Sequence, residues 1–266
     1  MEKFIACRKC AGKGVRGQST GYIFNAELNA VRECECHIRY RTNKGILDRL
    51  EKAGVGRDEF VLNYNIDTDY VGSLSVESVA KVKKYLSQFK AGVDAYHHAM
   101  LYMYGINGSQ KTTIGKYICK EIISTCKDDE FKDSLYPNYY KAVFITMNDL
   151  IKQLTILDTD KQEAAMKNIN ESDVLIIDES FDKEKVTIYK SGFQIPYLDT
   201  FLRKYMTNPT KSIIFISNVK PCLIESNGYS HSIQDFVERQ TTIQNSELPF
   251  MDNYVNSVDR FTGSLF

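Results

Sequence analysis

The clearest chemical signal in this chain is a glycine-containing segment at 105–113, which reads Gly-Ile-Asn-Gly-Ser-Gln-Lys-Thr-Thr. Glycines let the backbone amides of such a loop approach an anion, and a helix that follows the Lys-Thr pair directs its N-terminus at the same point. We therefore predict a phosphate-binding loop, in which Lys111 contacts the β- and γ-phosphates of ATP and the Thr112 hydroxyl coordinates Mg²⁺. The residues expected to surround the nucleotide are Gly105, Asn107, Gly108, Ser109, Gln110, Lys111, Thr112 and Thr113.

Gln110 departs from the usual form of this loop, which has glycine immediately before the lysine. A side chain at this position crowds the loop or forces an unfavourable backbone angle. We therefore expect a variant loop whose ATP affinity and turnover are reduced.

Acidic and amide side chains end two further apolar runs. Asp178 and Glu179 close the run at 173–179, and Asn218 closes the run at 212–218. Beside the phosphate-binding loop, Asp178 would hold the magnesium shell, and Glu179 would orient the attacking water as a general base. Asn218 would contact the γ-phosphate or the same water, although an asparagine at a strand end also serves as an ordinary loop cap.

A second kind of site is indicated near the N-terminus by Cys7 and Cys10, in a Cys-x-x-Cys pair, and by Cys34 and Cys36. Four thiolates suit the tetrahedral coordination of zinc, and such a site replaces a hydrophobic core in a short segment. We predict a structural zinc site of these four residues, without His37, because adjacent side chains rarely converge on one metal. Free or disulfide-bonded cysteines are the alternative.

These candidate residues need a scaffold of buried strands that alternate with helices. Apolar runs predict strands at 99–104, 141–146, 173–179 and 212–218, and helical spacing predicts helices at 38–53, 75–90 and 114–126. Continuous apolar strands separated by helices indicate a parallel sheet that is covered on both faces and binds ligands at the carboxyl ends of its strands. The segment at 56–75 is typical of an irregular connector.

Length and composition suit a globular protein of two domains, with 266 residues, 43% of them apolar and 26% charged. We expect a zinc-binding, partner-interaction module at 1–57, a connector at 58–75 and an ATPase domain at 76–266. The first of these carries 12 Lys and Arg against 6 Asp and Glu, a surplus that suits a phosphate backbone, an acidic protein surface or simply a solvated face. No uncharged apolar run of 18 or more residues occurs, so we expect a cytoplasmic protein without a membrane contact.

In this order the motifs resemble those of the DnaC/DnaI helicase-loader branch of the AAA+ ATPases, whose relatives include the IstB transposition ATPases. The resemblance covers most of the chain and adds the segments at 144–150 and 235–240. It implies an AAA+ P-loop fold, with a parallel sheet flanked by helices, behind a small zinc-binding module. It also implies that Arg239 completes the ATP site of a neighbouring subunit, although an ordinary arginine on a helix surface is the alternative. The nearby Arg203 is the second candidate, either for a neighbour's ATP site or for binding DNA.

The same resemblance implies a function in DNA replication. Members of this branch load a replicative hexameric DNA helicase, which they hold through the N-terminal module, and their ATPase domains bind single-stranded DNA with ATP. Such a composite ATP site also predicts self-association on ATP. Two alternatives stay open: a transposition or recombination regulator of the IstB type, and an adaptor that binds ATP without hydrolysing it.

Overall fold

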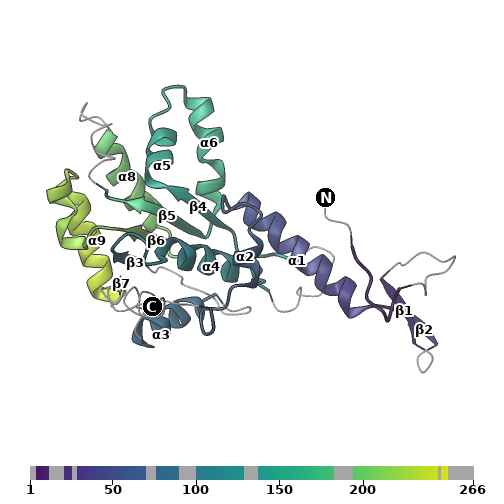
Figure 1. The fold of residues 1–266 in the computed structure, drawn as a ribbon. Coiled ribbons are helices and arrows are strands. Elements are labelled where there is room, and N and C mark those ends of the chain that lie inside the picture. The colour runs from purple at the N-terminus through teal and green to yellow at the C-terminus, as the bar shows by residue number, and fades with distance from the viewer. Residues whose placement is uncertain are drawn as a thin grey trace, which may run out of the picture.

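The structure is a computed structural model that describes residues 4–11, 21–25, 29–69, 76–89, 100–128, 137–182, 194–244 and 247–250. A helix-covered sheet forms its main body, and a long helix leads from there to a small hairpin (Figure 1). The strands are β1 (Tyr22–Asn25), β2 (Ala30–Glu33), β3 (Met100–Gly105), β4 (Ala142–Thr146), β5 (Val174–Ser180), β6 (Ser212–Ser217) and β7 (Glu247–Phe250). The α-helices are α1 (Glu35–Lys52), α2 (Glu59–Asn63), α3 (Val76–Leu86), α4 (Lys111–Ser124), α5 (Met147–Leu154), α6 (Thr159–Glu171), α8 (Gln194–Met206) and α9 (His231–Gln244).

The main sheet consists of five parallel strands in the order β4, β5, β6, β3, β7. Its central strands are apolar on both sides because successive side chains point to opposite, equally buried faces. On one face, Leu101 and Ile214 pack with residues of α1 to α4. On the other, Tyr102 and Phe215 pack with α5, α6, α8 and α9. This arrangement confirms the predicted α/β fold, a parallel sheet flanked by helices on both faces.

The segment expected to be an irregular connector instead contains helix α2. The carboxylate of Asp58 caps this helix by accepting a hydrogen bond from the Val61 amide, at 3.1 Å. Val61 is buried in the same core as α4, so the segment adds to the packing of the sheet. Two further elements, the β1–β2 hairpin and the edge strand β7, were not predicted.

Helix α1 connects the hairpin to the main body. Near its C-terminal end Leu50 is fully buried, and Arg49 donates a hydrogen bond from Nε to the Ile123 carbonyl at the end of α4. The carbonyl of Ala53, just after α1, accepts a hydrogen bond from the amide of Phe144 in edge strand β4. The C-terminal half of α1 therefore packs into the core of the main body. The predicted division of the chain at residue 57 stays a prediction.

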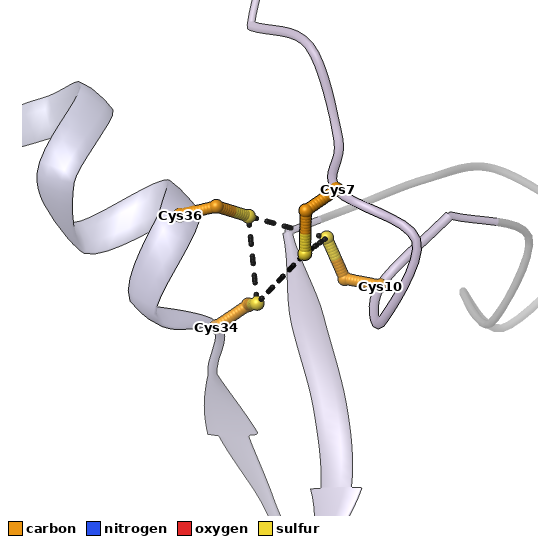
Figure 2. Close-up of side chains that lie close together, drawn as sticks. All are labelled: Cys7, Cys10, Cys34 and Cys36. Carbon is orange, nitrogen blue, oxygen red and sulfur yellow. Dashed lines mark hydrogen bonds between the residues drawn. The ribbon is translucent and has the colours of Figure 1, made fainter.

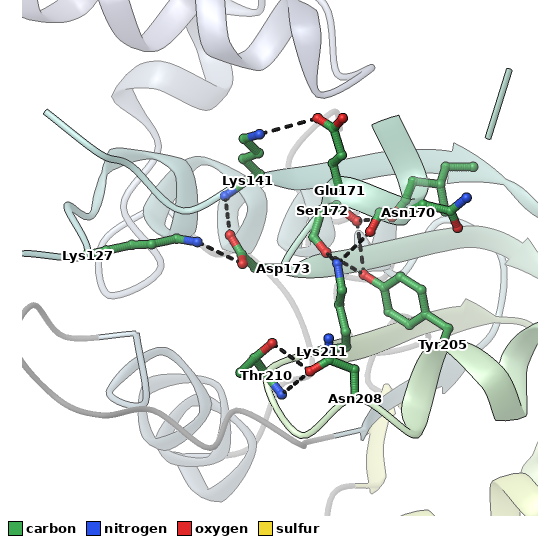
Figure 3. A network of polar contacts seen from close by, with 11 residues as sticks. Lys127, Lys141, Asn170, Glu171, Ser172, Asp173, Tyr205, Asn208, Thr210 and Lys211 are labelled. Carbon is green, nitrogen blue, oxygen red and sulfur yellow. Dashed lines mark hydrogen bonds and ion pairs between the residues drawn. The ribbon is translucent and has the colours of Figure 1, made fainter. Parts of the chain in front are cut away.

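A polar network holds the amino ends of the central strands together (Figure 3). Asp173, before β5, accepts a hydrogen bond at 2.8 Å from the backbone amide of Lys141, before β4. The ammonium of Lys211, before β6, donates to the carbonyls of Asn170 and Ser172 at the end of α6. Because these contacts lie at the amino edge, they leave the carboxyl edge open for a ligand site. Among the described helices, none combines the length and apolar character needed to cross a membrane.

Candidate functional site

A cleft of about 660 Å³ lies at the carboxyl edge of the sheet, between the loop after β3 and the ends of β5 and β6. The predicted loop residues at 107–113 line it, together with Asp178, Glu179 and Asn218. Parallel strands direct their carboxyl ends to one edge, which explains why motifs far apart in the sequence meet here. The fold thus gathers the predicted nucleotide-binding residues around one opening, except Gly105, which does not line it.

The side chain of Lys111 lies against its own loop. Its ammonium donates hydrogen bonds to the carbonyls of Gly105, at 2.9 Å, and Ile106, at 2.6 Å, and to the Ser109 hydroxyl, at 3.1 Å. Burial lowers the pKa of Lys111, whereas the nearby carboxylates raise it. An anionic phosphate would favour the charged form of this ammonium far more than these neutral oxygens do.

Thr112 and Asp178 provide adjacent oxygen atoms for a metal ion. The Thr112 hydroxyl donates to Oδ2 of Asp178 at 3.0 Å, and Oδ1 of Asp178 accepts from the Glu179 amide at 2.8 Å. Burial raises the pKa of Asp178, so a nearby cation would stabilise its ionised form. Hard hydroxyl and carboxylate oxygens are the protein ligands that Mg²⁺ takes beside phosphates, so these residues fit the ion.

Gln110 adopts an unfavourable backbone conformation, which is one of the two consequences that the sequence predicted. It is the residue before α4 and has φ of 63° and ψ of 16°, in the left-handed region. This conformation costs a residue with a Cβ atom roughly 1–2 kcal/mol, and glycine avoids that cost. The loop is therefore formed at the expense of strain, in a position that also lines the cleft.

The end of β5 contributes a residue that no sequence motif indicated. Asp182 lines the cleft, and its two carboxylate oxygens lie 3.4 and 3.3 Å from the amide nitrogen of Asn218. Its position three residues after Glu179 gives no signal by itself, because the path of the chain after the strand decides where Asp182 lies.

Arg239 does not line the cleft of its own chain. It lies on α9, where its Nε donates to Asp235 at 2.8 Å and its side chain is 73% exposed. Arg203 is held between two helices: it bonds Asp199 in α8 and both the carbonyl and the hydroxyl of Ser232 in α9. Arg239 is thus the more accessible of the two predicted arginines.

The four N-terminal cysteines form a compact group in the structure (Figure 2). Sulfur–sulfur distances are 3.8 Å for Cys7–Cys10, 3.7 Å for Cys7–Cys34, and 3.4 Å for both Cys10–Cys36 and Cys34–Cys36. A zinc ion with sulfurs at ~2.3 Å in a tetrahedron requires edges of about 3.8 Å. The group therefore fits a zinc ion after small movements of the side chains.

Local structure explains how these sulfurs meet. The amides of Cys10 and Ala11 donate to the Cys7 carbonyl and form a tight turn, while Cys34 begins α1 and Cys36 lies in its first turn. Amide hydrogen bonds from Cys10 and Lys9 lower the pKa of Cys7 to about 6, whereas burial raises the pKa of Cys10 to about 12. A bound metal cation would favour the thiolate form of both residues.

His37 lies outside the group of four sulfurs. Its Nδ1 is 2.6 Å from the Glu33 carboxylate. Gly21 packs against the His37 ring at φ of 75°, where a Cβ atom would lie 2.6 Å from the ring, so only glycine fits. Residues 12–20, between the two cysteine pairs, lie outside the described residues.

Comparison with known proteins finds no matching family profile and no matching curated protein. Among solved structures, the chain is similar to DnaI, with 13% identity, a TM-score of 0.49, and coverage of 73% of this chain and 92% of that one. It is also similar to the DnaC helicase loader, with 18% identity, a TM-score of 0.46, and coverage of 73% and 100%. A third similar structure is the replication initiator DnaA bound to AMPPCP and single-stranded DNA, with 15% identity, a TM-score of 0.47 and coverage of 76% of this chain. The chain spans 56% of that DnaA chain. Helicase loaders are thus among the structures similar to this chain, as the motif order indicated.

Proposed function

We propose that this chain is an ATPase that binds ATP with magnesium in the cleft, hydrolyses it, and uses it to load a replicative hexameric helicase onto single-stranded DNA. The observation that carries the ATPase assignment is the convergence of Lys111, Thr112, Asp178, Glu179 and Asn218 on one cleft at the carboxyl edge of a parallel sheet. The loader assignment rests on the order of motifs along the chain. We expect this reaction to take place in the cytoplasm of a bacterial cell, with a chain of bacterial or phage origin.

Each group in the cleft has a part in this reaction. Lys111 binds the β- and γ-phosphates, while Thr112 and Asp178 hold the magnesium ion, which neutralises charge on the phosphates. Glu179 accepts a proton from the water that attacks the γ-phosphorus, and Asn218 helps to position that water. The bond between the β–γ bridging oxygen and the γ-phosphorus breaks, and ADP and phosphate leave.

The balance of charges in the cleft supports the proposal that a second protein chain contributes a cationic residue to the site. Of the described residues that line it, Lys111 is the only cation, against the carboxylates of Asp178, Glu179 and Asp182. ATP adds further negative charge, so transition-state stabilisation requires a cation from elsewhere in addition to magnesium. The exposed Arg239 of a neighbouring copy is suited to this part, because its guanidinium stays charged and can bond two phosphoryl oxygens.

This shared site predicts complementation between two inactive variants. Lys111→Ala removes phosphate binding but keeps Arg239, while Arg239→Ala keeps the ATP cleft but removes the arginine. Each alone should lose ATP turnover, by roughly 1,000-fold or more for the arginine. An equimolar mixture should regain about a quarter of wild-type turnover, because random head-to-tail pairing joins an intact cleft to an intact arginine in that share of interfaces.

The matched control is a mixture of Lys111→Ala with Glu179→Gln, which should stay inactive because both substitutions damage the same cleft. The ATP turnover of each mixture is measured as phosphate release at several ratios of the two variants. Wild-type turnover in Arg239→Ala alone, or no gain on mixing it with Lys111→Ala, would rule out Arg239 as the shared residue.

For the N-terminal module, we propose that the cysteine group binds zinc and that the module holds the helicase. The sulfur distances support the metal. A 520 Å³ hollow beside the sulfurs, bordered by Arg8, Lys9 and Arg39, offers a basic surface for an acidic partner segment.

A further inference from the structure

Asp182 reaches the cleft because the chain turns sharply after β5. Glu179 and Phe181 both have left-handed backbones, with φ of 52° and 63°. For residues with a Cβ atom this conformation is strained by roughly 1–3 kcal/mol each, and it persists only where surrounding contacts enforce it. Such strain next to a reactive cleft indicates that the side-chain positions it produces contribute to function.

The turn is enforced by the burial of Phe181. Its ring is fully buried, is stacked on Tyr102 with an interplanar angle of 14°, and contacts Phe215 and Tyr229 with centroids 5.1 and 5.2 Å away. Its carbonyl accepts a hydrogen bond from the side-chain amide of Asn227, at 3.2 Å. With Phe181 fixed on both its side chain and its backbone, the next residue is directed back over the carboxyl edge.

The end of the neighbouring strand is fixed to the same turn. The Ser217 hydroxyl donates to the Ser180 carbonyl at 2.6 Å and accepts from the Val219 amide at 2.9 Å. Asn218, between these two residues, therefore has a defined backbone position. Its amide nitrogen faces the Asp182 carboxylate.

We propose that Asp182 is a positioning residue for Asn218: its carboxylate holds the amide nitrogen of Asn218, so that the carbonyl oxygen of Asn218 is the group offered to the attacking water. This inference rests on the proposed ATPase function and concerns the same cleft. A carboxylate accepts hydrogen bonds only, so it selects the orientation in which the amide nitrogen of Asn218 points toward it.

This orientation has a chemical consequence. With its nitrogen directed at Asp182, Asn218 offers a carbonyl oxygen, which can accept a hydrogen bond from water but cannot donate one to a phosphate oxygen. Glu179 and Asn218 then accept the two protons of one water molecule, and a lone pair of its oxygen is left to face the γ-phosphorus. One of those protons passes to Glu179 as the oxygen–phosphorus bond forms.

The test is a double-mutant cycle with Asp182→Asn, Asn218→Ala and the double variant, in the full chain. Asparagine keeps the size of Asp182 but no longer selects one orientation of the Asn218 amide. Turnover at saturating ATP and the Kd of a fluorescent ATP analogue are measured for each. We expect Asp182→Asn to lower kcat by roughly tenfold to 100-fold with a Kd within about twofold of wild type, the signature of a misplaced reacting group. The double variant should be no slower than Asn218→Ala, because both changes remove the same contact.

Each of the following outcomes would overturn the proposed positioning role of Asp182. Unchanged kcat in Asp182→Asn, or effects of the two substitutions that multiply, overturns the positioning role while leaving the ATPase proposal intact. A weaker Kd with unchanged kcat makes Asp182 a binding or structural residue and also overturns it. A wild-type chain that binds the analogue without hydrolysing ATP overturns the ATPase proposal, and the positioning role with it.

Discussion

Replacing Glu179 with glutamine should lower ATP turnover at saturating ATP by roughly 100-fold to 10,000-fold, because a general base contributes about that much to proton transfer. Glutamine keeps the shape of the side chain but cannot take the proton. Binding of a fluorescent ATP analogue should change little, since Lys111 and the loop at 105–110, which we expect to contact the phosphates, remain intact. Phosphate release and equilibrium binding, measured on one preparation, separate the two effects.

A matched control is Glu163→Gln, which makes the same change at an exposed position on α6, away from the cleft. It should leave both measurements at the wild-type level. If Glu179→Gln hydrolyses ATP at the wild-type rate, the cleft does not use Glu179 as its general base.

Replacing Cys34 with serine should remove the metal and unfold the N-terminal end of the chain. A structural zinc ion contributes about 10–16 kcal/mol of apparent folding free energy in small modules, more than the few apolar contacts around the hairpin can replace. Elemental analysis should give about one zinc ion per wild-type chain and almost none for Cys34→Ser. Hydrogen exchange should become fast in the β1–β2 hairpin and in the first turn of α1.

Cys222→Ser is the control, because Cys222 is exposed and lies outside the cysteine group. It should retain its zinc and its protection from exchange. In Cys34→Ser the main body should stay folded, because the C-terminal half of α1 is held by the core rather than by the sulfurs. Full zinc content in Cys34→Ser would contradict the proposed ligand set.

The parts of the fold that could be predicted are those encoded by local patterns. The strands now labelled β3 to β6 show as apolar runs that end in chemically distinctive residues, and their parallel arrangement follows from the helices between them. Convergence of the loop, Asp178 and Asn218 then follows from the geometry of any parallel sheet. The cysteine spacing likewise predicted a group that the structure brings together.

The features that could not be predicted depend on contacts between distant residues. Helix α2 has five residues, too few to show a helical period, and it is stabilised by packing on α4. Asp182 enters the cleft because Phe181 is buried against Tyr102 and two other aromatic rings, and no local pattern around 178–182 reveals that turn. Helix α4 also begins at Lys111 rather than at residue 114, because the Lys-Thr pair already forms its first turn.

At Gln110 the sequence and the structure give complementary information. The sequence identified the departure from glycine, and the structure shows that the loop keeps its left-handed turn at that position. The strain therefore makes this conformation of the loop less stable than it would be with glycine.

If the chain uses ATP to engage a replicative helicase, the tagged chain should recover that helicase from source-cell lysate. The capture is done with ATP and magnesium, beside the Lys111→Ala variant, and the replicative helicase is quantified by mass spectrometry. The account predicts that wild type recovers the helicase and that Lys111→Ala recovers much less. Recovery of a transposase in place of the helicase, or equal helicase recovery by both proteins, would contradict it.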